Sequence, residues 1–548
     1  MKKLLKYVII LLAVAPALAQ EEEAGELENV EIEIIKDRQI VLPKANRNFE
    51  KVPPRPVEPI KPEIVYEFKN LKFSSPDFNP VIRPMRLKQE AISKIYGNYL
   101  SAGFGNYSSP FLEGWVNSKR DKNKYIGAHL YHRSFGKGPV DEKNSANSNT
   151  QLRLFGKAFT NKTASSAFLN YENLGNYFYG YVPQPTEPDR KNFKQSYNIY
   201  SLGGEIENSK PADFSYNLKG GFSYLKDHYQ AAESEVALNL NTDYKIDDQK
   251  RLIFLADYYI IARKDSLRDA APRHLLKIKP AYLFSAVENL WLTVGVNAAY
   301  ENDTLTTKSF HLYPNVNARY QLSKSVEAYA GLTGDMDKVS LHTLARENQW
   351  VNSNLDIFHT NRSIEFLGGL KGKFGRKVGF GAGLALTNFK GLYFYKNDFT
   401  NRSKFDVVYD AGNTKRAAFF GELSYAHAET VKLSLRGDYY SYSTDKIAEA
   451  WHRPKYRGVF NSTFNLYKKI VFNFDFIAQG GAKAYDYEKS AVVELKPALD
   501  LGFRTDYYLS KQFAVFVQLN NVLGNQYQIY LNYPVRGLQV LGGVSWSF

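Results

Sequence analysis

Strict alternation between apolar and polar residues recurs along most of this chain, and it limits the fold more than any other feature. In IVFNFDFIAQ, residues 470–479, the apolar residues Ile470, Phe472 and Phe474 alternate with polar residues such as Asn473. The same alternation runs through two distant segments, residues 236–244 (VALNLNTDY) and 431–439 (VKLSLRGDY). Because successive side chains of a β-strand point to opposite faces, each segment predicts a strand with one apolar and one polar face. The polar faces carry charges, which suits contact with water rather than the core of a β-sandwich.

Aromatic residues are abundant in a chain that is polar on average. Aromatics make up 15% of the 548 residues, with 40 Tyr and 36 Phe, yet the mean hydropathy is −0.41. A soluble core relies more on Leu, Ile and Val, whereas a membrane barrel needs aromatic girdles outside and polar residues inside. The composition therefore favours a transmembrane β-barrel.

Two kinds of connection separate the alternating segments from Asn98 onward. Short polar turns such as KRDKNK and IDDQK alternate with longer connections, which we place at residues 137–148, 177–195, 264–272, 335–361, 445–455 and 524–537. Short turns at one end and long loops at the other are typical of outer-membrane barrels. The pattern predicts an all-β fold, a transmembrane antiparallel β-barrel of about 22 strands over residues 97–548. One of the last wall strands is predicted to begin at Ala491.

Three prolines fall inside the predicted strands, at Pro280, Pro314 and Pro497. A closed barrel has no edge strand on which a proline is tolerated. Each proline follows a longer loop and precedes an alternating run. We therefore predict that all three lie at the outer rim of the barrel, where a β-bulge is tolerable.

Residues 1–19 have the features of a secretory signal peptide. Lys2 and Lys3 precede an apolar run over residues 7–14, and Ala19 offers a cleavage site before Gln20. No later segment has the roughly 18 uninterrupted apolar residues that a spanning helix needs. We therefore expect an exported chain without a spanning helix. The chain has no Cys, which excludes disulfides, thiolate metal sites and a lipoprotein anchor.

Residues 20–96 differ in composition from the rest of the chain. Residues 20–35 hold seven Glu and no basic residue, and a Pro-rich stretch follows that includes VPPRPVEPIKPEI. Proline favours extended, polyproline-like backbone. We predict a periplasmic segment that is either a flexible tether, a filler of the barrel lumen or a docking arm for a partner protein. The sequence leaves these alternatives open.

The last residues form a strand that ends on an aromatic side chain. Val540, Val544, Trp546 and Phe548 share one face, and Ser545 lies on the other. The apolar face is expected to contact outer-membrane lipid, with the aromatic rings in the interfacial belt. The strand must pair with the first one, because unpaired backbone groups in hydrocarbon are costly. The ending Val544, Trp546, Phe548 resembles the C-terminal signal that the barrel-assembly machinery reads on bacterial outer-membrane proteins.

Both ends of the predicted barrel resemble TonB-dependent receptors. The C-terminal part contains Asn520-Asn521, then Gly524-Asn525, Tyr533-Pro534 and the final strand, similar to the last hairpin of that family. The segment GNYLSAGFGNYSSPFLEGWVNS, residues 97–118, resembles the first two barrel strands. The resemblance covers residues 97–548 and implies an outer-membrane barrel of 22 strands that transports a solute.

The chain departs from that family ahead of the barrel. Family members carry a folded plug domain of well over a hundred residues, preceded by an energy-coupling box, whereas only residues 20–96 are available here. A barrel of 22 strands left open is a wide channel. We therefore expect the lumen to be filled by residues 20–96, by an inward-folded loop such as 335–361, or by another protein.

The sequence contains no recognisable catalytic or cofactor-binding motif. His129 and His132 lie three residues apart on one strand, so they point to opposite faces and do not form a shared metal site. Gly379, Gly381 and Gly383 alternate within a strand and lack the helix that a dinucleotide-binding loop requires. We read these glycines as a smooth small-residue patch on the lumen wall.

The net charge of +15 arises from Lys and Arg spread along the chain. Such a distribution fits lipid headgroups better than nucleic acid. Charged residues on the polar faces, Asp243, Arg436, Asp438 and Asp475, are candidates for setting the selectivity of a lumen.

Two functions fit these features. The first is transport of a solute across the outer membrane by a TonB-dependent-receptor-like barrel. The second is a plugless barrel that acts as a structural or accessory subunit of an outer-membrane assembly, with residues 20–96 docking periplasmic partners. Neither function involves an enzyme activity or a cofactor.

Overall fold

The computed structural model describes residues 96–119, 121–181, 189–303, 305 and 308–548. The predicted signal peptide, with its cleavage site between Ala19 and Gln20, lies outside the described residues. So does the predicted segment 20–96 apart from its last residue.

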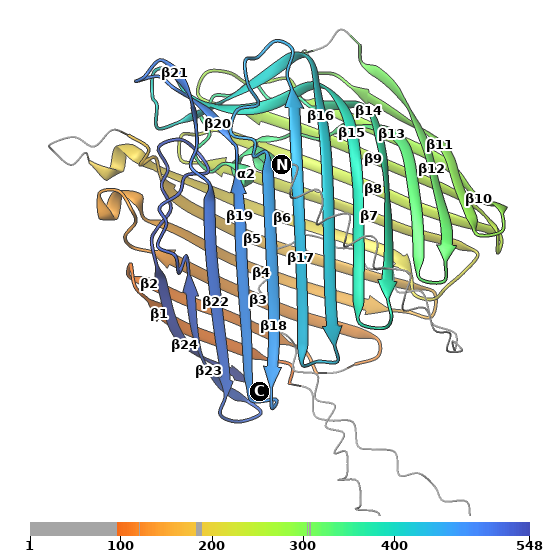
Figure 1. Cartoon of the computed structure of the whole chain (residues 1–548), viewed down its shortest axis with the longest axis horizontal. Helices are drawn as coiled ribbons and strands as arrows, with labels where there is room; N and C mark the ends of the chain where they lie inside the picture. The colour runs from red at the N-terminus through yellow and green to blue at the C-terminus, as the bar shows by residue number, and fades with distance from the viewer. Residues whose placement is uncertain (1–95, 120, 182–188, 304, 306–307) are drawn as a thin grey trace, which may run out of the picture. The chain divides into compact units, whose positions relative to one another are not determined.

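The described chain forms one closed sheet of 22 antiparallel strands (Figure 1), as the alternation predicts. The wall strands are β1 (Tyr99–Gly105), β2 (Ser109–Asn117), β3 (Lys124–Phe135), β4 (Asn147–Phe159), β5 (Thr163–Tyr177), β6 (Lys194–Asn208), β7 (Phe214–Asp227), β8 (Ala232–Asp247), β9 (Lys250–Lys264), β10 (Arg273–Val287), β11 (Leu290–Glu301), β12 (Phe310–Ser323), β13 (Val326–Asp337), β14 (Thr360–Phe374), β15 (Val378–Asn397), β16 (Phe405–His427), β17 (Val431–Ser443), β18 (Tyr456–Leu466), β19 (Ile470–Gly480), β22 (Ala498–Tyr508), β23 (Phe513–Asn520) and β24 (Gln539–Ser547). Each wall strand pairs with its neighbours along the chain.

The first and last strands close the barrel. In the β1–β24 ladder, Leu100 lies opposite Trp546. Beyond that ladder, the N–H of Phe548 donates to the carbonyl of Asn98 at 3.0 Å, and the N–H of Asn98 donates back at 3.1 Å. The aromatic end of the chain is therefore paired to its last residue, and the sheet has no free edge.

The two ends of the barrel differ in their connections. At one end, here called the turn rim, neighbouring strands are joined by short turns such as residues 375–377 and 467–469. At the other end, the loop rim, most connections are longer and carry the remaining elements of the described residues. These elements are the 3₁₀ helices η2 (Glu142–Ser145) and η3 (Arg190–Phe193), helix α2 (Leu341–Glu347), and the hairpin strands β20 (Lys483–Asp486) and β21 (Ala491–Glu494).

The strand register separates an apolar outer face from a polar lumen. Residues directly opposite each other in a ladder share a face, so the pairs Phe474–Phe503, Phe503–Leu519 and Leu519–Val540 lie on one side of the wall. Val540 and Trp546 lie on that side in β24, and Trp546 is 46% exposed. Phe472 and Phe474 therefore face outward, as predicted.

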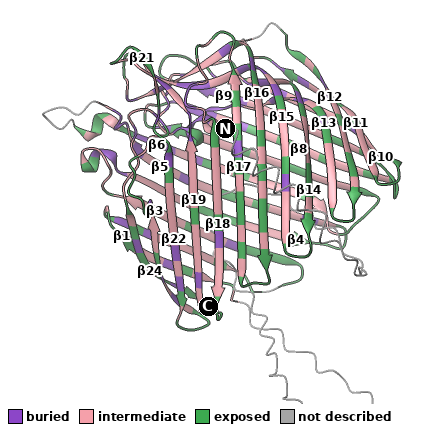
Figure 2. Cartoon of the chain, viewed as in Figure 1, coloured by how far each residue is buried: buried purple, intermediate pink, exposed green. Residues whose placement is uncertain are grey.

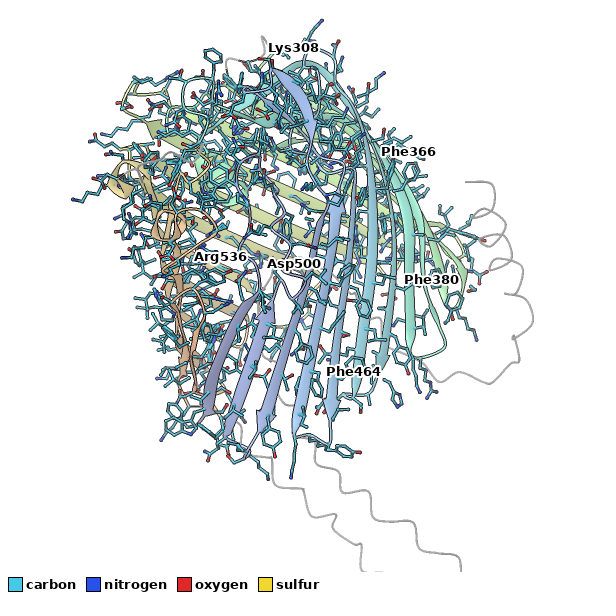
Figure 3. All side chains as sticks on the ribbon, turned by 60° about the vertical axis from the view of Figure 1, so that its left-hand side comes forward. Lys308, Phe366, Phe380, Phe464, Asp500 and Arg536 are labelled. Atoms are coloured by element: carbon cyan, nitrogen blue, oxygen red, sulfur yellow. The ribbon has the colours of Figure 1, made fainter. Side chains whose placement is uncertain are left out.

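Apolar side chains continue around the outside of the wall. Figure 3 places Phe366, Phe380 and Phe464 on the outer surface, and exposed residues recur along the wall strands in Figure 2. Leu, Val, Phe and Tyr supply most of these positions. Such a surface meets the requirement of a bilayer, in which backbone groups are paired and the outward side chains are apolar. Among the described residues, no helix has the length and apolarity needed to cross a membrane.

The predicted strand start at Ala491 is wrong. Ala491 begins β21, which pairs with β20 in a small two-stranded sheet outside the wall. The wall strand is β22 and begins at Ala498. The alternation in AVVELKPALDLGF continues across both strands, but Pro497 lacks an N–H and separates them. Pro497 therefore precedes a wall strand instead of lying within one.

Pro280 also departs from its predicted place at the rim, because it lies in the middle of β10. The ladder to β9 runs through Pro280, which lies opposite Phe254. The ladder to β11 lacks pairs between Ile278 and Ala281 and then resumes in the same register. Because Pro280 has no backbone N–H, its pairing with β11 is interrupted locally, but the strand has no β-bulge at this point. Pro314 lies opposite Val296, just before the ladder to β13 begins.

Candidate functional site: an inner loop across the lumen

The connection between β13 and β14, residues 338–359, folds into the barrel and is here called the inner loop. Its helix α2 begins after Ser340, whose Oγ accepts the N–H of Thr343 at 3.2 Å. Leu341, Leu344 and Ala345 are at most 1% exposed and form one side of the helix. They belong to a buried cluster that includes side chains of β5, β6 and β7. The helix therefore packs against strands that are distant from its own in the sheet.

The N-cap of α2 offers a modest test of this packing. Ser340→Ala removes the side-chain acceptor for the N–H of Thr343 and is expected to destabilise the docked helix by about 1 kcal/mol. Limited trypsin digestion of the folded protein should cut faster after Arg346, which is exposed on α2. Ser340→Asp, which restores an N-cap acceptor, should reverse the effect. Equal digestion rates for all three proteins would contradict a role for the cap.

The end of α2 is anchored to β5 and β6. The backbone carbonyl of Gln349 accepts the side-chain amide of Asn176 and the hydroxyl of Tyr197, each at 3.1 Å. The indole Nε1–H of Trp350 donates to the carbonyl of Tyr177 at 3.1 Å. Backbone groups that would otherwise be unpaired in the lumen are therefore satisfied by the opposite wall.

Further anchors lie on β8 and β9. The carboxylate of Glu233 accepts the N–H groups of Leu341 at 2.7 Å and His342 at 3.0 Å. The guanidinium of Arg263 donates to the carbonyl of Ser353 at 3.0 Å and also to that of Leu355. These bonds hold both halves of the inner loop against the wall.

The inner loop also extends the pairing of β16. Val351 forms a parallel bridge with Phe405. The N–H of Asn352 donates to the carbonyl of Phe405 at 2.7 Å, and the N–H of Phe405 donates to the carbonyl of Trp350 at 3.0 Å. The loop is thus fastened to β5–β9 on one side and to β16 on the other.

An aromatic cluster fills the space where the inner loop meets the connection 521–538. The ring of Trp350 stacks on Tyr533 with centroids 4.0 Å apart, and Tyr179 lies 4.7 Å from Tyr533. Phe405 contacts Tyr530 at 5.4 Å. Tyr533 is 2% exposed. Aromatic pairs at these distances contribute attraction beyond the area they bury.

The charged side chain of Glu347 lies at the other side of the aromatic cluster. The carboxylate of Glu347 accepts bonds from Arg453 at 2.7 Å and Tyr395 at 3.1 Å, and its carbonyl accepts the hydroxyl of Tyr530 at 2.9 Å. Burial alone lowers the pKa of Arg453, but the adjacent Glu347 carboxylate and tyrosine hydroxyls raise it by more, so the net shift is upward. Arg453 is therefore a permanent cation that ties the connection 444–455 to α2.

Three histidines lie in the same region in their neutral form; His359 and His452 are buried, and His342 is partly exposed. Burial lowers the pKa of His342 to about 4, of His359 to about 3 and of His452 to about 4. Each uses a ring nitrogen as an acceptor: His342 from Arg346 at 2.8 Å, His359 from the N–H of Val339 at 3.1 Å, and His452 from the N–H of Leu531 at 3.2 Å. His359 thereby joins the two ends of the inner loop to each other.

The predicted lumen charges all face the lumen but lie in separate parts of the wall. Arg436 binds Asp438 at 2.8 Å and Glu422 at 3.1 Å. Asp243 lies 3.5 Å from Arg251 on β9. Asp475, on β19, is exposed. The structure thus brings Arg436 and Asp438 together and leaves Asp243 in a different ion pair.

The glycine patch predicted on the lumen wall is not smooth. A Cβ on Gly381 would lie 2.8 Å from the carboxylate of Glu422, and one on Gly383 would lie 2.7 Å from Phe420 and from the hydroxyl of Tyr329. Large side chains of the neighbouring strands therefore cover the glycines. These larger side chains pack in the space that the glycines, which have no side chain, leave open.

The two histidines and the C-terminal aromatic residues that were singled out in the sequence pack against neighbouring side chains. His129 stacks on Trp115 with centroids 3.8 Å apart, whereas His132 lies on the opposite face beside Thr150. Within the described part of the chain, no three His, Cys, Asp or Glu side chains are placed to hold a metal ion. Trp546 and Phe548 stack at 4.2 Å on the outer face, on the same side as Val544.

Comparisons with known proteins identify the fold. Neither a protein-family model nor a curated protein matches the sequence. One similar solved structure is the FrpB iron transporter from Neisseria meningitidis, with a TM-score of 0.65 and 10% identity over 83% of this chain and 82% of that chain. The siderophore receptor PirA from Acinetobacter baumannii has a TM-score of 0.63 and 10% identity over 82% of this chain and 80% of that chain. A mutant of the ferric enterobactin receptor PfeA from Pseudomonas aeruginosa has a TM-score of 0.61 and 10% identity over 82% of this chain and 80% of that chain. The barrel therefore has the fold of TonB-dependent receptors, as the resemblance of its two ends predicts.

Proposed function

We propose that this chain is an outer-membrane barrel that transports a solute, and that the inner loop is the barrier in its lumen. The observation that carries the proposal is the fastening of residues 338–359 to opposite parts of the wall, through Gln349 to β5 and β6 and through Val351 to β16. The apolar outer surface supports placement in a bilayer. The fold shared with the iron and siderophore receptors supports transport rather than catalysis.

The proposal includes an orientation and a route of assembly. Both ends of the closed wall lie at the turn rim, where Asn98 pairs with Phe548. With export through the predicted signal peptide 1–19, the turn rim faces the periplasm and the loop rim faces the outside. Val544, Trp546 and Phe548 would then be the residues that the barrel-assembly machinery reads.

Deleting the inner loop tests the proposal directly. Val339 and His359 contact each other, so residues 340–358 can be replaced by a short Gly-Asn turn without moving β13 or β14. The full chain should show low conductance in planar bilayers and slow swelling of liposomes in a small neutral sugar. The deletion variant should conduct about tenfold better, because the anchors across the lumen are gone and a barrel of this size encloses a wide channel.

A control removes a shorter segment, residues 483–494, whose hairpin pairs outside the wall sheet. The hairpin β20–β21 closes through the N–H of Leu495 and the carbonyl of Ala482, 2.9 Å apart. Joining residues 482 and 495 should leave conductance near that of the full chain. Equal conductance of the full chain and the inner-loop deletion would contradict the barrier.

The alternative, an accessory subunit of an outer-membrane assembly, predicts a different result. The native protein would then purify from outer membranes in a fixed ratio with other proteins. Deleting the inner loop would then change neither the conductance nor the uptake of a solute.

A further inference from the structure

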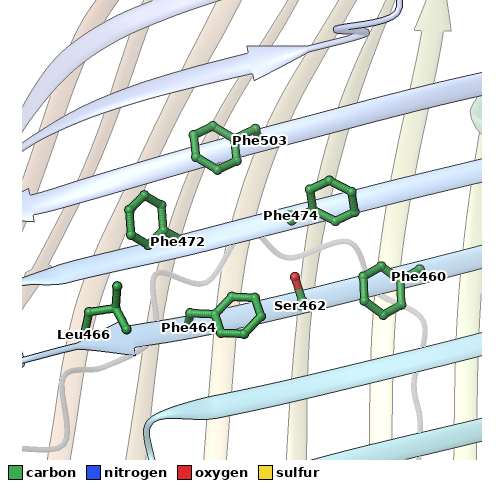
Figure 4. Close-up of a pocket in the computed structure, with 7 residues that line it drawn as sticks. All are labelled: Phe460, Ser462, Phe464, Leu466, Phe472, Phe474 and Phe503. Atoms are coloured by element: carbon green, nitrogen blue, oxygen red, sulfur yellow. The ribbon is translucent and has the colours of Figure 1, made fainter.

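A shallow apolar depression lies on the outer face of β18, β19 and β22. Its rim consists of the rings of Phe460, Phe464, Phe472, Phe474 and Phe503. Figure 4 shows the rings around Ser462, from three neighbouring strands. The register places all of them on the membrane-facing side, because Phe474 lies opposite both Ser462 and Phe503.

Ser462 creates the depression. It is the smallest of these outward residues and is 5% exposed, since larger rings stand around it. Phe460 and Phe474 meet edge to face with centroids 5.8 Å apart, and Phe472 lies 5.8 Å from Phe503. The rings thus contact each other around the serine. An apolar hollow one side chain deep remains at this point of the wall.

The depression continues toward a basic part of the turn rim. The turn between β18 and β19 contains Lys468 and Lys469, and the turn between β22 and β23 contains Lys511, all exposed. The N–H of Tyr508 donates to the carbonyl of Lys469 at 2.8 Å, which brings the two turns together. Tyr467, in the first turn, is 92% exposed. An exposed tyrosine beside lysines is typical of the level of lipid headgroups.

The dimensions match one lipid molecule. Ser462 lies four residues before Leu466, the last residue of β18, which is about 13 Å along the strand at roughly 3.3 Å per residue. For a strand tilted by about 40°, this is a depth of about 10 Å, or a third of a hydrocarbon core of about 30 Å. An acyl chain attached to a phosphate at the lysines therefore reaches the hollow at Ser462.

We propose that this face binds an anionic phospholipid, with its phosphate at Lys468, Lys469 and Lys511 and an acyl chain in the depression at Ser462. The inference rests on the membrane location in the proposed function and goes beyond it by naming a ligand and a site. Charge complementarity selects an anionic headgroup over a zwitterionic one. The depth of the hollow suits a single chain of methylene groups rather than the side of a protein helix.

Native mass spectrometry of the full chain in detergent tests the site. Delipidated protein is mixed with phosphatidylglycerol or with phosphatidylcholine that carries the same acyl chains. We expect at least one phosphatidylglycerol to be retained with an affinity roughly tenfold higher than phosphatidylcholine, as expected for a few lysines near an anionic headgroup. Equal retention of the two lipids would overturn the proposal.

Two variants separate the two parts of the site. Ser462→Leu fills the hollow and should weaken the retention of both lipids. The triple variant Lys468→Gln, Lys469→Gln, Lys511→Gln removes the charges and should abolish the preference for phosphatidylglycerol. Ala382→Leu, at an exposed outward position on β15, and Arg376→Gln with Lys377→Gln, in another turn, are the matched controls and should retain it. Retention by Ser462→Leu at the wild-type level would refute the acyl-chain part.

A competition experiment identifies the source of the bound phosphate. Millimolar inorganic phosphate should not displace phosphatidylglycerol, because the acyl chain contributes to binding. Full displacement would show a headgroup-only basic patch and would contradict the proposal. Co-purification of a bound protein, instead of a phospholipid, at this face from native membranes would also contradict the proposal. A failed lipid test leaves the conductance result of the inner-loop deletion unaffected, so the two proposals fail independently.

Discussion

Replacing Trp350 by alanine is expected to release the inner loop from the wall while the barrel stays closed. The substitution removes the stacking on Tyr533 and the hydrogen bond from the indole to Tyr177. Truncating a packed Trp costs about 3 kcal/mol or more. Because that cost falls on the docked loop and not on the wall ladder, the population of undocked loop should rise by roughly a hundredfold.

Single-channel recording measures this population directly. Trp350→Ala should show frequent openings to the conductance of the inner-loop deletion, whereas the parent should open rarely. Trypsin should also cut faster after Arg346. Trp350→Phe keeps an aromatic ring but loses the hydrogen bond to Tyr177, so it should lie between the two.

A second tryptophan supplies the control for general damage to the barrel. Trp291 begins a lumen-facing row on β11, away from the residues that anchor the inner loop. Trp291→Ala should leave the rate of opening unchanged. If Trp350→Ala and Trp291→Ala open the channel equally, the inner loop is not held by the aromatic cluster.

The wall could be predicted from the sequence because its signal is local. A strand pattern needs only residues two apart, and IVFNFDFIAQ shows its two faces without any knowledge of its neighbours. The same locality explains the error at Ala491. Alternation continues through the hairpin strand β21, which has no place in the wall, and only the proline at 497 marks the break.

The anchors of the inner loop could not be predicted in the same way. Residues 335–361 were expected as one possible inward loop because the connection is long, but its partners lie far away in sequence. Glu233 caps a helix that begins 108 residues later, and Asn176 binds a carbonyl 173 residues away. Such pairs depend on how the closed sheet brings distant strands to opposite sides of one lumen. The local signals of α2 are the N-cap residue Ser340 and the helical spacing of Leu341, Leu344 and Ala345.

Protonation of two histidines is expected to loosen the inner loop between about pH 6.5 and pH 4. His342 and His359 are neutral acceptors in the docked loop, with pKa values lowered to about 4 and about 3 by burial. In an undocked loop the same groups regain a pKa near 6.5. Above about pH 6.5 both states bind no proton, and docking has its full stability. As the pH falls below 6.5, the undocked state takes up protons first, so docking weakens until the pH reaches the lowered pKa values.

The magnitude of this effect is large because two histidines act together. A pKa lowered by about 2.5 units corresponds to roughly 3 kcal/mol for one histidine at pH values below its lowered pKa. Asp303 acts in the opposite direction, since burial raises the pKa of its carboxyl group and it takes up a proton in the docked state. It faces the histidine region through the N–H of His359 at 2.5 Å. Glu233 and Asp227 are further buried carboxylates that accept hydrogen bonds from the inner loop, through the N–H of Leu341 and the hydroxyl of Ser353. The contribution of the histidines is therefore measured as the difference between the parent and a variant without them.

Channel opening as a function of pH provides the measurement. As the pH falls from 6.5 to 4, the parent should open more often than the double variant His342→Gln, His359→Gln, and the difference should vanish when the pH is restored. In the double variant the side-chain amides can still form hydrogen bonds but do not titrate. Equal pH profiles of the two proteins would show that these histidines do not set the stability of the inner loop.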